Sequence, residues 1–232
     1  LELTTVEATG TAIGPQGKHL LVVDGDNTDD VTLFNLTNPW DLSSAVKDSG
    51  MNTPVSPGFG GGGEISGDGK KVFVSDYSGQ VVHYDLSTAW DLSSATQNET
   101  RTFSYSSGMD FSPDGTRMVL SNRDDPHQAT MFRLSTPWDL DSATNHSTIE
   151  YSDVDFGFEG DGVALSYDGS KIYIGGQNNG VYSFELSQPW NLESSTLIQQ
   201  DVFGTGMGLD VSPDGTKAIT GYTHGDVRLY SE

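Results

Sequence analysis

Three carboxylates stand at one position of a sequence repeat, where they could act together. Glu64, Asp110 and Asp210 each lie five residues before the glycine of a repeated turn, and two further copies have Ala12 and Ala164 there. Glycoside hydrolases need a general acid and a second carboxylate flanking the bond that they cleave. Glycoside hydrolysis at a central channel is therefore one hypothesis. The alternative, which we favour, is that these side chains cap backbone amides of neighbouring repeats.

A second set of side chains combines aromatic rings with basic groups, in the segments that differ most between copies. Rings that stack, next to polar groups that orient a ligand, would suit a sugar. The candidate ligand-binding residues are Tyr77, Tyr105, Arg123, His127, Phe158, Tyr222 and His224. The alternative is that they are ordinary solvated loop residues.

An acidic segment, DGDNTDD at 24–30, could bind calcium, which takes six to eight oxygen ligands. Its carboxylates are Asp24, Asp26, Asp29 and Asp30. The segment begins like an EF-hand loop, but it has Thr28 where a third ligand would fall and lacks the downstream Glu. A second acidic segment, at 153–161, offers a similar cluster. We expect no cofactor, with calcium at these loops as the alternative.

The composition narrows the class of protein. Eleven basic residues against 33 acidic ones give a net charge of −22, which repels nucleic acid and anionic membranes. No run approaches the ~18 apolar residues of a membrane span, and cysteine is absent. The hydrophobic fraction of 34% and the 28 glycines favour short strands joined by tight turns over long helices.

These residues belong to a repeat with a period near 50 residues. The four tryptophans, Trp40, Trp90, Trp138 and Trp190, are separated by 50, 48 and 52 residues. A turn motif, SPDGT in its clearest copies, occurs five times, with glycine at 17, 69, 115, 169 and 215 and another glycine seven residues earlier each time. Each copy contains four short alternating segments, which is typical of one blade of a β-propeller.

The sequence therefore predicts an all-β fold, a five-bladed propeller with four-stranded antiparallel blades. One domain, 1–232, is expected, with units at approximately 10–57, 58–105, 106–156, 157–205 and 206–232. The last unit ends after its third strand, so residues 1–9 are predicted to supply its fourth strand. This closure would protect an open sheet edge.

The tryptophan segments, such as TPWD at 136–139, are interpreted as structural. Thr136 is predicted to cap a helical turn, with Pro137 first in the turn and Asp139 completing a capping box. The Trp would then pack beneath the blades. The alternative is a set of four indole platforms for stacking sugars.

Alternating strands would place these segments and the SPDG turns on one uniform face. The connections that differ between units would lie on the opposite face, and variable loops on a rigid frame are where recognition usually occurs. We therefore expect any binding site on the variable face.

The SPDGT hairpins resemble those of WD40-like and YVTN-type propellers. The repeat LSTPWDLSSAT resembles repeats of propeller proteins from marine bacteria and their tailed phages. This resemblance implies a non-catalytic binding or structural module at an extracellular or virion surface, with a protein partner in an assembly or a cell-surface glycan as ligand. A dedicated multivalent lectin and a glycoside hydrolase remain as alternatives.

Overall fold

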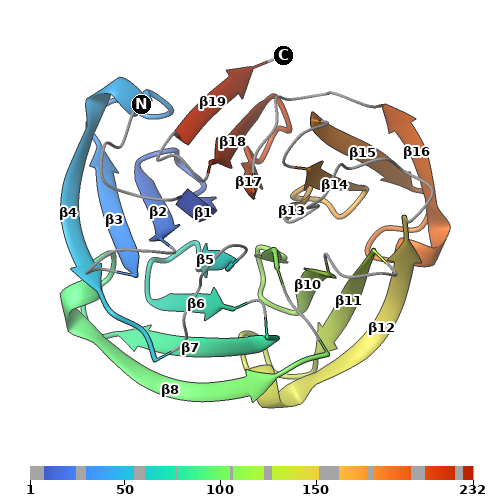
Figure 1. Ribbon diagram of the computed structural model, residues 1–232, viewed down its shortest axis with the longest axis horizontal. Coiled ribbons are helices and arrows are strands. Elements are labelled where there is room, and N and C mark those ends of the chain that lie inside the picture. The colour runs from blue at the N-terminus through green and yellow to red at the C-terminus, as the bar shows by residue number, and fades with distance from the viewer. Residues whose placement is uncertain are drawn as a thin grey trace.

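The chain forms a ring of five antiparallel sheets, which confirms the predicted five-bladed propeller (Figure 1). The computed structural model describes residues 8–24, 30–54, 61–76, 78–104, 107–122, 127–151, 162–176, 180–199, 207–222 and 227–231. Among them, no helix is long and apolar enough to cross a membrane.

Each blade is a meander of neighbouring hydrogen-bonded strands. Blade one contains β1 (Ala8–Ile13), β2 (His19–Asp24), β3 (Val31–Leu36) and β4 (Ala45–Met51). Blade two contains β5 (Gly63–Ile65), β6 (Lys71–Ser75), β7 (Gln80–Leu86) and β8 (Ala95–Thr102). Blade three contains β9 (Met109–Phe111), β10 (Arg117–Asn122), β11 (Gln128–Leu134) and β12 (Ala143–Glu150). Blade four contains β13 (Val163–Leu165), β14 (Lys171–Gly176), β15 (Gly180–Leu186) and β16 (Ser195–Gln199), and blade five contains β17 (Gly208–Val211), β18 (Lys217–Gly221) and β19 (Val227–Ser231).

The ring closes through the first strand of every blade. In a complete cycle, β1 contacts β5, β5 contacts β9, β9 contacts β13, β13 contacts β17, and β17 contacts β1. The described part of blade five has three strands. The predicted fourth strand falls on residues 1–9, of which 1–7 lie outside the described residues, whereas Ala8 and Thr9 belong to β1.

The SPDG segments form the turns between the first and second strands. In blade three the Asp114 carboxylate accepts hydrogen bonds from the Thr116 N–H at 3.0 Å and the Ser112 hydroxyl at 2.7 Å. Gly115 has a φ of +69°, a conformation that side chains with a Cβ rarely adopt, and the other four turn glycines match it. The repeated glycine is thus a backbone requirement.

The tryptophan segments contain short 3-10 helices, which begin later than predicted. They are η1 (Leu42–Ser44), η2 (Leu92–Ser94), η3 (Leu140–Ser142) and η4 (Leu192–Ser194). In blade three the N-cap is Asp139, whose carboxylate accepts from the Asp141 N–H at 3.0 Å. The prediction of Thr136 as cap was therefore wrong, because Pro137 and Trp138 precede the helix instead of starting it.

Trp138 adopts a left-handed φ of +64°, and Trp40, Trp90 and Trp190 do the same. This conformation costs roughly 1–2 kcal/mol for a residue with a Cβ. The backbone N–H of Trp138 donates to the Gly115 carbonyl at 2.9 Å, and equivalent bonds occur in blades one, two and four. The tryptophan segment is therefore anchored to the SPDG turn of its own blade, on one face of the ring.

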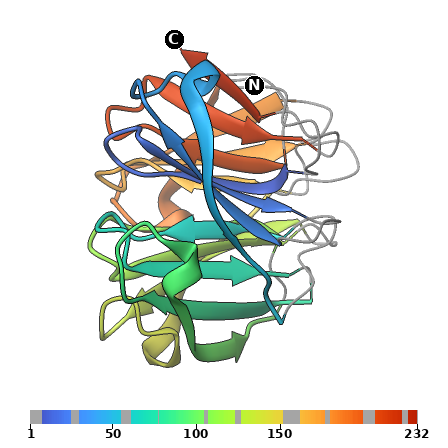
Figure 2. The same cartoon turned by 90° about the vertical axis from the view of Figure 1, so that its left-hand side faces the viewer.

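The hydrophobic core lies between neighbouring blades. One cluster joins Leu21 and Leu33 of blade one to Val72 and Tyr84 of blade two, and similar clusters join the other sheets around the ring. Figure 2 shows the ring from its side, with strands running between two faces. We call the face with the SPDG turns and tryptophan segments the uniform face, and the opposite one the variable face.

Candidate functional site

The three repeated carboxylates meet at the axis of the ring. Glu64 lies on β5, Asp110 on β9 and Asp210 on β17, and all three line one cavity. The cavity has a volume of about 70 Å³, which is room for about two water molecules. It opens on the uniform face, because residues of the SPDG turns form its rim: Pro15, Gly67, Pro113, Tyr167 and Pro213.

Asp110 bridges two blades through its two carboxylate oxygens. Oδ1 accepts from the N–H of Phe111 in its own blade at 2.6 Å. Oδ2 accepts from the N–H of Leu165 in blade four, also at 2.6 Å. Asp110 is 7% exposed. It therefore joins the first strands of blades three and four at a largely buried position.

Asp210 makes the same pair of contacts where the ring closes. Its Oδ1 accepts from the Val211 N–H and its Oδ2 from the Ile13 N–H in blade one, both at 2.6 Å. Glu64 caps only its own blade, with Oε1 accepting from the Ile65 N–H at 2.8 Å.

Three carboxylates thus satisfy the equivalent N–H group of all five blades. The two blades with Ala12 and Ala164 at the repeated position are those whose amide is reached by the aspartate of the preceding blade. The alanines are therefore permitted by the reach of Asp110 and Asp210. This arrangement is the capping of backbone amides that the sequence analysis favoured over glycoside hydrolysis.

Burial at the axis raises the pKa values of all three carboxyl groups. Burial is the largest cause for Asp110, whose pKa rises to about 7 although the Leu165 and Phe111 amides lower it. The pKa of Glu64 is raised well above its ordinary value by burial, then by the charges of Asp110 and Asp210. Burial and the charge of Asp110 also raise the pKa of Asp210. The contact between the Glu64 and Asp110 side chains also raises the pKa of Glu64 and lowers that of Asp110.

This geometry differs from that of a glycosidase pair. Glycosidase carboxyl groups lie roughly 5–9.5 Å apart, so that a sugar fits between them, whereas Glu64, Asp110 and Asp210 line a cavity of only about 70 Å³. The oxygens that hydrolysis would use are already engaged by backbone N–H groups. Chemically, the cluster can hold protons and join blades.

Two of the predicted ligand-binding residues lie within the described residues. Tyr222 carries the Arg228 guanidinium over its ring, 4.3 Å from the ring centroid, and its hydroxyl lies 3.3 Å from that of Tyr230. His127 stacks near Tyr151, with ring centroids 6.4 Å apart, and no hydrogen bond of its buried Nδ1 is found among the described residues.

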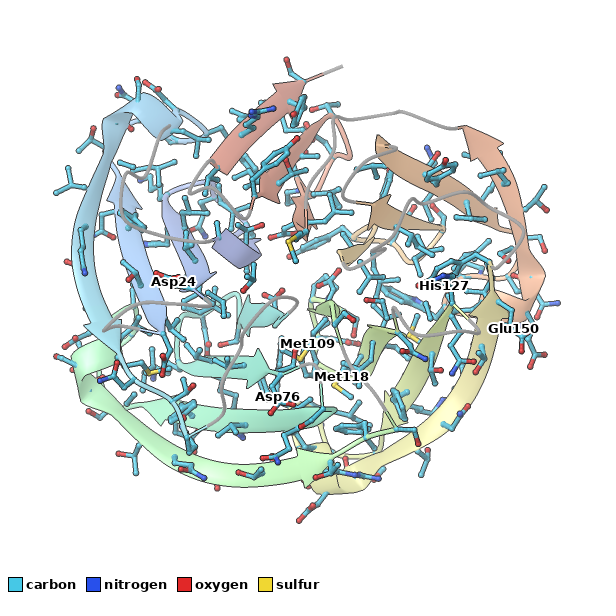
Figure 3. The ribbon with its side chains drawn as sticks, in the orientation of Figure 1. Asp24, Asp76, Met109, Met118, His127 and Glu150 are labelled. Carbon is cyan, nitrogen blue, oxygen red and sulfur yellow. The ribbon has the colours of Figure 1, made fainter. Side chains whose placement is uncertain are left out.

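Figure 3 shows His127 in the same blade as Glu150, whereas Tyr222 belongs to blade five. The remaining predicted ligand-binding residues lie outside the described residues: Tyr77, Tyr105, Arg123, Phe158 and His224.

The predicted calcium segment is described at its two ends. The Asp24 N–H donates to the Asp30 carbonyl at 2.8 Å. The Asp30 carboxylate accepts from the N–H of Thr53 at 2.5 Å and from its hydroxyl at 3.3 Å, so it fastens the end of the loop to a neighbouring segment. Asp26 and Asp29 lie outside the described residues. Among the described residues, no group of three or more potential ligands could hold a metal ion.

A buried imidazole on β7 of blade two was not identified from the sequence. His83 is 2% exposed and stacks on Phe73, with ring centroids 4.5 Å apart. Its Nδ1 lies 3.1 Å from a Glu99 oxygen, and its Nε2 lies 3.4 Å from Asp85. Burial is the main cause that lowers its pKa. The only sequence signal is its place in the alternation of β7.

Comparison with known proteins supports the fold and gives no family. No family model matches the chain, and no curated protein matches it in sequence. A protein from Lactobacillus plantarum is similar in structure, with a TM-score of 0.53 and 16% identity over 97% of this chain and 80% of that one. Hydrazine synthase from Kuenenia stuttgartiensis has a TM-score of 0.51 and 15% identity over 96% and 83%.

A third similar structure is a Bacteroides fragilis protein described as a candidate 6-phosphogluconolactonase. Its TM-score is 0.50 and its identity 19%, over 84% of this chain and 54% of the other. Identities this low show a shared propeller fold alone, because propellers carry many unrelated functions.

Proposed function

We propose that this chain is a non-catalytic β-propeller that binds a partner protein or a cell-surface glycan through its variable face, as part of an extracellular or virion surface. The observation that carries the proposal is the engagement of the axial carboxylates. Asp110 and Asp210 each accept two backbone N–H groups, and Glu64 accepts one. The cluster that could have been catalytic has a structural task in the ring.

The uniform face also has a structural task. In each tryptophan segment the backbone N–H of the tryptophan donates to the carbonyl of a turn glycine, and the indole lies over that turn. Because the same internal contacts recur in four blades, this face serves as a rigid scaffold. Binding groups would then be displayed by the connections on the opposite face. This reasoning supports contacts through the variable face.

The net charge of −22 supports an environment of high salt, where screening relieves self-repulsion. It also disfavours polyanionic partners. Tyr222, held by Arg228 and Tyr230, offers an aromatic group on the variable side of blade five. A dedicated lectin would use the same rings, and multivalent glycan binding would distinguish it from a protein-binding module.

The test is a glycan array at seawater-like salt, with and without calcium. We compare the wild type with Tyr222→Ala and with Tyr167→Ala, a matched control in which an exposed tyrosine is removed from the uniform face. A glycan site on the variable face predicts binding that Tyr222→Ala weakens and Tyr167→Ala leaves unchanged. Silence across the array would assign the variable face to protein contacts.

The non-catalytic part of the proposal has its own test. The wild type and Asp110→Asn are assayed against chromogenic glycosides at several pH values. We expect no turnover by either protein. Turnover by the wild type that disappears in Asp110→Asn would make the chain a glycoside hydrolase and overturn the proposal.

A further inference from the structure

Blade two shows how this fold neutralises a basic group at the start of its second strand. Lys71, the first residue of β6, donates to one oxygen of the Asp85 carboxylate on β7 at 2.7 Å. The Asn98 side chain on β8 donates to the other oxygen, also at 2.7 Å. Lys71 and Asp85 lie opposite each other in the sheet, and Asn98 is the extra residue of a bulge. One carboxylate therefore lies between donors from the strands on either side of it.

The same three positions in blade three all carry basic side chains. Arg117 on β10 lies opposite Arg133 on β11, and His146 is the extra residue of the equivalent bulge in β12. These strands are neighbours in one sheet (Figure 1). Side chains directly opposite each other share one side of a sheet, and like charges there are destabilising. The chain has 33 acidic residues and only 11 basic ones, so composition does not account for a second cation at this position.

The other blades do not repeat this arrangement. The residue opposite the first position of the second strand is Asn35 in blade one, Glu185 in blade four and Ser231 in blade five. Of the five pairs, which all lie within the described residues, that of blade three alone joins two permanently charged cations. The exception is therefore confined to one blade.

The three basic groups of blade three are close enough to influence one another. Partial burial lowers the pKa of Arg117, the charge of Arg133 lowers it further, and Asp114 opposes both effects. Partial burial also lowers the pKa of His146, as do the charges of the two arginines. Glu193, on the short helix η4 that packs against β12, raises the pKa of His146. Because Arg133 and His146 are both exposed, the cluster is open to solvent.

Much of the hydrogen-bonding capacity of this cluster is unused within the described part of the chain. One terminal nitrogen of Arg117 donates to the carbonyl and the hydroxyl of Thr116, at 3.0 and 3.2 Å. The Arg117 Nε is buried and has no acceptor there. The ion pairs found among the described residues include none of Arg117, Arg133 or His146. Blade three thus presents donors at the positions where blade two holds a carboxylate, and an arginine fork is well suited to bind one.

We propose that Arg117, Arg133 and His146 form an anion-binding site that takes an aspartate or glutamate carboxylate of a partner polypeptide. The carboxylate would lie on blade three where the Asp85 carboxylate lies on blade two. An amino-acid carboxylate is favoured because it is the group that the equivalent position holds in this fold, whereas the net charge of −22 disfavours polyanions. The site lies near the uniform face, since Arg117 closely follows the turn glycine Gly115. It is therefore separate from the variable-face contacts of the proposed function.

The test follows the imidazole resonances of His146 by NMR while the acetylated and amidated tripeptide Gly-Asp-Gly is added. Salt is kept at about 0.1 M, where the Debye length of about 10 Å screens the distant acidic groups. We expect a saturable shift with a midpoint on the order of 10 mM, as for a ligand of few atoms. We also expect the pKa of His146 to rise in the bound state, because a neighbouring anion favours the imidazolium. The neutral tripeptide Gly-Asn-Gly should produce neither effect.

Three variants separate a specific site from general attraction. Arg133→Gln should weaken binding at least about fivefold, because it removes one guanidinium fork. Lys171→Gln is the matched control: it removes one positive charge at the position of Arg117, but in blade four, and should leave binding within about twofold of wild type. Arg133→Asp places a carboxylate opposite Arg117, as in blade two, and should abolish binding while the melting temperature stays equal or rises. That result would distinguish an occupied site from an unfolded one.

Four results would overturn the proposal. One is the absence of a saturable shift of His146, and another is an equal response to Gly-Asn-Gly. The third is an equal loss of binding in Lys171→Gln and Arg133→Gln, because general attraction would then account for the shift. The fourth is saturation by glucuronate without saturation by Gly-Asp-Gly, which would assign the site to an acidic sugar. All four are independent of Tyr222, so this experiment fails or succeeds separately from the test of the proposed function.

Discussion

Replacing Asp110 with alanine should destabilise the ring more than replacing Glu64. Asp110→Ala removes the acceptors of two buried N–H groups, on Phe111 and Leu165, whereas Glu64→Ala removes the acceptor of only Ile65. A buried donor that loses its partner costs roughly 1–3 kcal/mol. The expected losses in the free energy of unfolding are therefore about 2–6 kcal/mol for Asp110→Ala and about 1–3 kcal/mol for Glu64→Ala.

The pH dependence gives a second, independent measure of the same site. The pKa of Asp110 is raised in the folded state from 3.8 to about 7, so the folded protein holds a proton that the unfolded chain releases. Its contribution to stability is therefore fully present below pH ~4 and declines as pH rises to about 7, by at most about 1.4 kcal/mol per pH unit. The stability deficit of Asp110→Asn, which cannot ionise, should accordingly narrow between pH 5 and pH 8.

The assay is urea unfolding followed by circular dichroism, at pH 5, 6, 7 and 8. Asp210→Ala is the matched comparison, since it also leaves two amides, on Val211 and Ile13, without acceptors and should behave like Asp110→Ala. The capping interpretation would be refuted if Glu64→Ala lost as much stability as Asp110→Ala. A deficit of Asp110→Asn that does not vary with pH would refute the raised pKa of Asp110.

Two further predictions concern the turns and the buried imidazole. Gly115→Ala should cost several kcal/mol in urea unfolding, because its Cβ would overlap the Trp138 indole, whereas Gly215→Ala should cost only the roughly 1–2 kcal/mol of its left-handed φ. Equal losses would contradict the overlap with the indole as the cause. His83 should titrate below pH 6.5 in an NMR experiment on the folded protein, because burial lowers its pKa. Its contribution to stability is present above pH ~6.5 and is lost as pH falls, since the unfolded chain then binds the proton more readily; a titration midpoint at or above 6.5 would contradict this.

The residues that recur at fixed positions in every repeat were sufficient to predict the fold. A glycine at each turn, a glycine seven residues earlier and alternating strands between them are requirements of local backbone geometry, and local geometry is encoded in neighbouring residues. The structural interpretation of Trp138 also came from local sequence, because its segment recurs with the turn that it covers. Only the helix start was misplaced, at Thr136 in place of Asp139. Several residues in such a segment can cap a helix, and the left-handed Trp138 between them has no sequence signature.

The partners of the axial carboxylates depended on tertiary structure. Asp210 and Ile13 are 197 positions apart in sequence, and closure of the ring alone brings the carboxylate to the amide. Nothing in the sequence near Asp110 indicates a pKa of about 7, because that shift comes from burial at an axis where first strands converge. Sequence spacing placed the carboxylates at equivalent positions, but the curvature of the ring decided which amides they reach.

The position of Ile198 follows the same division. In the sequence, Ile198 is one apolar residue of the segment STLIQ, and nothing in its neighbours shows how it lies in the sheet. The bulge register places Ile198 where other blades carry Asp48, Asn98 and His146. Local sequence determines which turns and strands form, because their geometry depends on adjacent residues. Packing between blades determines which surfaces are covered, because those contacts join residues that only the closed ring brings together.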